Sequence, residues 1–170
     1  MKKNIRFLTH AALIAALYVV ISWLQNMLLP GSASQMIQFR VSEALCVLPF
    51  LLPETAWGLF VGCWVANLIS PYGALDMVVG SLATLLAALW TSKCRRKWMA
   101  PLPPAVCNAI LVGAVIAWQQ SGSAETFLPL FGFNMVSVGL GEAVVCFALG
   151  LVLLRVLEKH PGIYRKNHKM

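Results

Sequence analysis

Charged residues are scarce in this sequence of 170 residues. Asp, Glu, Lys and Arg together make up 11% of the chain, whereas hydrophobic residues make up 59% and the mean hydropathy is +0.77. Soluble domains carry about 25% charged residues. This shortage excludes an ordinary soluble domain and indicates an all-α integral membrane protein.

The sequence also lacks the usual signatures of metal, disulfide and nucleotide chemistry. Its five cysteines form no C-x-x-C pair and sit mostly in apolar runs, which is typical of buried thiols. The three histidines lie near the basic ends of the chain, away from the carboxylates, so we expect no metal site and no cofactor. No phosphate-binding G-x-x-x-x-G-K-[ST] motif occurs, so any ATP would have to be hydrolysed by partner proteins. A membrane enzyme is disfavoured, because no Ser or Cys has a His at comparable depth.

Basic residues are plentiful but confined. The formal net charge is +7, and twelve of the thirteen Lys and Arg residues fall in three clusters, within residues 2–6, 93–97 and 155–169. Each cluster flanks an apolar segment, as cytoplasmic loops do, so this distribution argues against nucleic-acid binding. The clusters predict cytoplasmic termini and a multi-pass protein of the cell membrane.

The apolar runs predict a single membrane domain of six helices, over residues 7–29, 39–52, 55–69, 74–92, 101–119 and 131–157. Segments 39–52 and 55–69 are shorter than the roughly 20 residues that cross a bilayer. They fit either two tilted spans or a re-entrant pair. We favour two spans, because only an even total returns all three basic clusters to one face.

Polar residues gather toward the predicted outer ends of these segments. A charge at the centre of a membrane helix costs about 2.5 to 3.5 kcal/mol on insertion scales, so such residues usually serve a site. Glu142 is the deepest carboxylate, since eight helical residues after Asn134 place it about 12 Å below the outer boundary. Asn134, Glu142 and the residues between them at helical spacing share one face, which we expect to look into the bundle. The predicted substrate-binding residues are Arg40, Glu43, Trp64, Asn67, Asp76, Asn134 and Glu142.

Other interpretations remain open for these residues. Arg40 and Glu43 are three residues apart and fit an ion pair on one helix face. Asp76 follows Pro71-Tyr72-Gly73 and fits a helix cap. Glu142 fits a protonated or hydrogen-bonded core carboxyl. If they do form a site, carboxylates, amides and a Trp ring suit a planar, nitrogen-rich ligand such as a purine-like base.

Small residues form stripes on several predicted helices. Ala11, Ala12, Ala15 and Ala16 make two overlapping small-xxx-small patterns that allow another helix to approach closely. This helix could pack within the protein or dock on another membrane subunit. A similar stripe at Gly58, Gly62 and Ala66 favours internal packing.

One stretch resembles a known family. The run R-V-S-E-A-L…L-P-F…G-L-F-V-G-C…A-N-L-I-S, followed by L-D-M-V-V-G-S-L-A-T-L-L-A-A-L, is similar to the QueT family. These proteins are the substrate-binding (S) components of energy-coupling factor (ECF) transporters for queuosine precursors. The resemblance covers about residues 5–158 and is densest over 40–89. The alanine pattern looks like the A-x-x-x-A motif by which S components dock on their coupling subunit.

The resemblance implies a non-catalytic capture subunit. Its partners would be a transmembrane coupling subunit and two ATP-binding-cassette ATPases. Its substrate would be a deazaguanine base, either queuine or a cyano or aminomethyl precursor. The loop 30–38 would form an external lid. An S component for another vitamin or nucleobase, and a scaffold whose polar groups only join helices, remain alternatives.

Overall fold

The computed structural model describes residues 2–31, 39–69 and 73–160, and its regular elements within those ranges are all helical. Most of the predicted lid, residues 32–38, lies outside the described residues. The elements in order are α1 (Lys2–Leu28), η1 (Val41–Phe50), α2 (Thr55–Ala66), η2 (Asn67–Ile69), α3 (Gly73–Thr91), η3 (Lys97–Met99), α4 (Leu102–Gln120), α5 (Ala124–Val145), η4 (Cys146–Gly150) and α6 (Leu151–Glu158). Of these, η1, η2 and η3 are 3₁₀-helices and η4 is a π-helical turn.

The expected class, a helical membrane protein, is confirmed by four long apolar helices. These are Ile5–Leu28, Gly73–Thr91, Lys97–Gln120 and Ala124–Glu158. The two segments predicted to be short are indeed short, at Val41–Phe50 and Thr55–Ala66. Whether they complete six spans stays a prediction.

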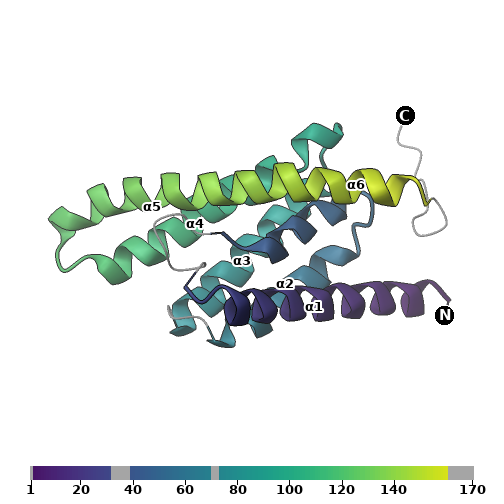
Figure 1. Ribbon diagram of the computed structural model, residues 1–170, viewed down its shortest axis with the longest axis horizontal. Coiled ribbons are helices and arrows are strands. Elements are labelled where there is room, and N and C mark those ends of the chain that lie inside the picture. Colours follow the sequence, from purple (N-terminus) through teal and green to yellow (C-terminus); the bar gives the residue numbers. More distant parts are fainter. Residues whose placement is uncertain (1, 32–38, 70–72, 161–170) are drawn as a thin grey trace.

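The last long helix begins earlier than the predicted start at residue 131. Ser123 and Thr126 form a capping box that satisfies the exposed N–H groups of the first turn, so the helix begins at Ala124. From there α5, η4 and α6 run on as one continuous rod, which crosses the upper side of the molecule in Figure 1.

Two departures from α-helical geometry lie against each other. The 3₁₀-helix η1 contains Pro49, and it packs on the π-helical turn η4 of the long rod. The contact is close, because a Cβ on Gly150 would lie 2.7 Å from Cγ1 of Val47. Val47, Cys146 and Leu154 form a buried apolar cluster at this contact. It holds the first turn of η1, with Glu43, beside the last turns of α5.

The helix α1 packs along α2 through small residues. A Cβ on Gly58 would lie 2.3 Å from the carbonyl oxygen of Ala11, and one on Gly62 would lie 2.9 Å from that of Ala15. Gly58, Gly62 and Ala66 are all buried, so the predicted internal use of that stripe is confirmed.

The alanine stripes of α1 therefore divide between two faces. Ala11 and Ala15 meet α2, whereas Ala12 and Ala16 are exposed on the opposite side. The structure assigns one pattern to internal packing and leaves the other on the surface.

The basic end of the molecule is tied together by a hydrogen bond and an ion pair. Nδ1 of His10 lies 3.0 Å from Oε1 of Glu54 in the turn between η1 and α2. Lys97, after α3, pairs with Glu158 at the end of α6. Figure 1 shows the first turn of α1 and the last turn of α6 at the same end, opposite the connection between α4 and α5. Which side of the membrane this end faces stays a prediction.

Candidate functional site

Buried polar faces on α3 and α5 provide the wall of the candidate site. On α5 the predicted face is confirmed, since Asn134, Ser137, Val138, Gly141 and Glu142 are all buried. The face of α3 has the same character, and its buried members include Asp76, Gly80, Ala83, Thr84 and Ala87. Facing polar surfaces of this kind inside a membrane bundle mark a functional site by default.

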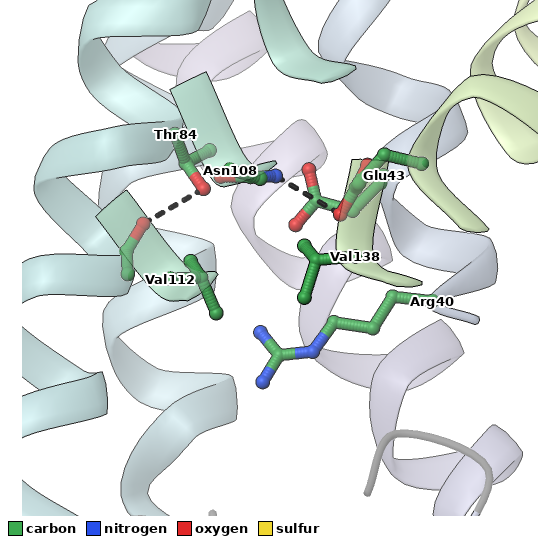
Figure 2. A pocket seen from close by; sticks show the side chains of 8 residues that line it. Arg40, Glu43, Thr84, Asn108, Val112 and Val138 are labelled. Atoms are coloured by element: carbon green, nitrogen blue, oxygen red, sulfur yellow. Dashed lines mark hydrogen bonds between the residues drawn. The ribbon is translucent and has the colours of Figure 1, made fainter. Parts of the chain in front are cut away.

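A small cavity lies where these faces meet the start of η1. Its lining residues are Arg40, Glu43, Gly80, Thr84, Asn108, Val112, Val138 and Glu142. Figure 2 shows Asn108 of α4 at this space together with Arg40 and Glu43 from the start of η1, with Val112 and Val138 as apolar walls. The cavity measures about 10 Å³, which is room for roughly one water molecule. The lining elements must therefore separate before any larger ligand can enter.

Glu43 is held at this cavity by hydroxyl and thiol donors. Its side chain is 1% exposed, and its Oε1 accepts a hydrogen bond from the hydroxyl of Tyr18 on α1. The thiol of Cys46 lies 2.9 Å from its other oxygen. Neither donor carries a positive charge, so the carboxyl has no cation among these direct partners.

Glu142 faces Glu43 from α5 and takes its partner from α4. Its side chain is 6% exposed, and Nδ2 of Asn108 donates to its Oε1 at 2.9 Å. The cavity thus places two buried carboxyl groups together. Groups of this kind attract a cation or several N–H donors, because an uncompensated buried charge is costly.

Arg40 is the basic residue in the cavity lining, and it is engaged. Its Nη2 lies 3.1 Å from Oδ2 of Asp76, and its Nη1 donates to Oδ1 of Asn67 at 3.1 Å. Nδ2 of Asn67 donates in turn to the backbone carbonyl of Asp76 at 3.2 Å. The proposed local pair with Glu43 does not form: Arg40 reaches across to α3 instead. The carboxylate of Asp76 serves this ion pair, beyond any role as a helix cap.

Two predicted site residues lie apart from this cluster. The side chain of Trp64 is 45% exposed on the outside of α2. Asn134 is buried, but its Nδ2 donates to Oε1 of Gln120 at 2.9 Å, near the connection between α4 and α5. The structure brings together the other five of the seven predicted residues, either in the cavity lining or directly behind Arg40. Their contact with ligand stays a prediction.

Comparison with known proteins identifies the family of this chain. The sequence profile of the QueT transporter family matches residues 8–159, most of the chain. The chain belongs to the QueT transporter family.

A curated relative supports the assignment. The queuosine precursor transporter QueT of Lactococcus lactis subsp. cremoris (strain MG1363) is 33% identical over 87 residues, which cover 51% of this chain and 50% of the relative. The match thus spans about half the length of that relative. No solved structure matches the chain significantly.

Two residues of this QueT-family site were missed in the sequence. Asn108 is 3% exposed within α4, and Tyr18 is fully buried within α1. Each is an isolated polar group in an apolar helix, which is the signal that could have found Asn108. Tyr18 gives no such signal, because a Tyr near a membrane segment is usually interfacial. Within the described part of the chain, no cluster of His, Cys, Asp and Glu has the arrangement of a metal site.

Proposed function

We propose that this chain is the substrate-capture subunit of an importer for a queuosine precursor, and that it binds the base in the cavity between η1, α3, α4 and α5. The observation that carries the proposal is the pairing of Glu43 with Glu142, both buried, in the cavity lining of a QueT-family bundle. A deazaguanine base offers adjacent N–H donors, which carboxylates accept. Membership of a family of transporters, and a relative named for queuosine precursors, supply the class of cargo.

The charge distribution favours a cationic cargo. Arg40 is already paired with Asp76, so the two glutamates are left as the acidic groups facing the cavity. An ammonium group on the base would neutralise these carboxylates, because Arg40, the cation in the cavity lining, already pairs with Asp76. We therefore assign the substrate's ammonium to Glu43, which leaves Glu142 to accept the N–H donors of the ring. Among queuosine precursors this favours the aminomethyl base over the cyano base.

Transport by this chain would depend on partners. Its sequence contains no phosphate-binding loop for ATP. We propose a transmembrane coupling subunit and two ATP-binding-cassette ATPases, in the manner of an ECF transporter of the cell membrane. The exposed face of α1 at Ala12 and Ala16 suits close helix packing against such a subunit.

The first test is direct binding to the purified protein. Isothermal titration calorimetry with the aminomethyl deazaguanine base should give saturable binding, and Glu142→Gln should raise the Kd by about 10-fold or more, because hydrogen bonds to charged groups contribute about 1.5 to 3 kcal/mol. The matched control is Glu125→Gln, on the same helix but exposed in its first turn. Its Kd should equal that of the unmodified protein.

The outcomes separate the candidate functions. Equal affinity of Glu142→Gln for the base would remove Glu142 from the site. Binding of another vitamin or nucleobase in place of deazaguanines would keep the capture role and change the cargo. A folded protein that binds none of these compounds would leave the polar groups as structural links between helices.

A further inference from the structure

Asn108 presents an unusual buried acceptor to the candidate site. Its side chain is 3% exposed, and its Nδ2 donates to Oε1 of Glu142 at 2.9 Å. Its Oδ1 is buried without a hydrogen-bond partner among the described residues. The NH₂ group of this amide faces Glu142, and its carbonyl points elsewhere.

A buried carbonyl oxygen without a hydrogen-bond donor, such as Oδ1 of Asn108, destabilises the folded protein. A buried polar group without a partner costs about 1 to 3 kcal/mol, so native proteins rarely retain one without a use. Asn108 lines the cavity with Glu43 and Glu142, so an occupant of the cavity is placed to supply the missing donor. The present volume, about 10 Å³, is large enough for one water, and a base would require the walls to widen.

The groups around Asn108 indicate which kind of ligand would carry the missing hydrogen-bond donor. Its amide carbonyl and the Glu142 carboxylate are two acceptors joined by one hydrogen bond. A guanine-type edge carries two donors side by side, a ring N–H and an exocyclic amino group. Val112 and Val138 add apolar surface to the same cavity, which suits the faces of a flat ring.

We propose that Asn108 is a specificity-determining residue: its Oδ1 accepts the exocyclic amino group of a guanine-type base while Glu142 accepts the ring N–H. The inference rests on the function proposed above and adds which edge of the base the site recognises. It means that the site selects bases carrying this amino group over analogues that lack it. A missing donor leaves the buried carbonyl unpaired, which is the mechanism by which polar sites reject close analogues.

The test compares two ligands on two proteins. The ligands are the aminomethyl deazaguanine base and its analogue with hydrogen in place of the exocyclic amino group. The unmodified protein should bind the amino-bearing base about 10-fold more tightly, the range expected for one hydrogen bond to a buried acceptor. In Asn108→Leu, both ligands should bind more weakly and the ratio of their Kd values should fall to about one. Thr91→Val, which removes a buried hydroxyl bonded to Ala100 away from the cavity, should keep the 10-fold ratio.

The Kd ratio isolates the proposed contact from general damage. Loss of the Asn108–Glu142 hydrogen bond weakens both ligands alike and does not alter the ratio. If Asn108→Leu does not fold, Asn108→Ser retains a small polar side chain too short to reach the same position, and it too should abolish the preference. A preference that persists in either folded variant overturns the proposal, as does an unmodified protein that binds both bases equally. Failure of the unmodified protein to bind either base would contradict the proposed function itself.

Discussion

The guanidinium of Arg40 joins three elements at the mouth of the site. It precedes η1 in the chain, donates to Asn67 at the start of η2 and pairs with Asp76 in the first turn of α3. Asp76 is 1% exposed, so its charge depends on this partner. Removing one member of a buried ion pair is usually far more damaging than removing both.

This asymmetry gives a prediction for the pair. Arg40→Met should leave the Asp76 carboxylate buried without its cation, and the free energy of unfolding should fall by about 3 to 5 kcal/mol. The melting temperature in detergent, followed by circular dichroism, measures the effect. The double variant Arg40→Met with Asp76→Leu should recover much of the loss.

The control for this prediction is Arg95→Met, which removes an exposed arginine from the loop after α3 and should barely change the melting temperature. A double variant less stable than Arg40→Met would show that the pair is not the reason for the loss.

Helical periodicity predicted the site where a buried face is continuous, and it failed at the edge of such a face. The buried face of α5 from Asn134 to Glu142 follows directly from spacing. Trp64 lies three residues before Asn67, a spacing that leaves two side chains about 60° apart around an α-helix; Asn67 is 4% exposed whereas Trp64 is 45% exposed, so the buried face ends between them. The partner of Arg40 was unpredictable because Asp76 lies 36 residues away and is reached only in the folded bundle.

At the scale of elements, α1 carries two different surfaces. Its inner seam against α2 allows no side chain at Gly58, where a Cβ would lie 2.3 Å from the carbonyl oxygen of Ala11. Its outer face carries Ala12 and Ala16 among exposed hydrophobic residues. The sequence showed both stripes but could not divide them, since both have the same spacing.

Separate substitutions should distinguish the two surfaces. Gly58→Ala should force α1 and α2 apart and lower the unfolding free energy by about 1 to 3 kcal/mol, the usual cost of overpacking. Ala16→Leu should leave the melting temperature and base binding unchanged but abolish uptake of labelled base by cells that co-express the proposed coupling subunit and ATPases. Both readouts use the same set of purified proteins and expressing cells.

The control for Gly58→Ala is Gly132→Ala on α5, where a Cβ would meet nothing within 4 Å. This variant should be neutral or slightly stabilised, because Ala favours a helix over Gly by about 1 kcal/mol. Full uptake by Ala16→Leu would show that this face does not dock the partner.

The short element η1 shows that a sequence pattern can predict a helix without predicting its type. Its apolar composition predicted a helix of about the right extent, but nothing in the pattern distinguishes a 3₁₀-helix from an α-helix. Its geometry is set by tertiary packing, with Val47 against Gly150 of the π-helical turn. That mutual fit holds Glu43 and Glu142 at one cavity, so the site depends on two irregular elements that periodicity cannot foresee.

For the whole molecule, the central question is how the bundle crosses the membrane. The contacts of His10 with Glu54 and of Lys97 with Glu158 gather four chain segments at one end. Together with the basic clusters, this favours a cytoplasmic location for that end and an external location for the connection between α4 and α5. If the two short helices also span, as predicted, they cross a locally thinned region or lie tilted, because η1 has 10 residues and α2 has 12.

Thiol labelling tests this topology with residues at opposite ends. Cys94, between α3 and η3, and Cys107, within α4, are partly exposed, while Cys46, Cys63 and Cys146 are buried, so the test uses a Cys107→Ser background. Partial burial raises the pKa of the Cys94 thiol, so a smaller share of it is thiolate and its labelling should be slower than that of a free thiol and should speed up as the pH rises. A membrane-impermeant maleimide should label Cys94 in inside-out vesicles and leave it unlabelled in right-side-out vesicles.

The opposite end needs an introduced thiol. Gly122→Cys, made in a background that also carries Cys94→Ser, adds a side chain at an exposed position where a Cβ meets nothing within 4 Å. It should be labelled only in right-side-out vesicles, and the background with both Cys94→Ser and Cys107→Ser should show little labelling in either orientation. Labelling of both positions from the same side would mean that α4 does not cross the membrane. Labelling with the two sides exchanged would place the basic clusters outside, and the candidate site would then open toward the cytoplasm, which is incompatible with capture from outside.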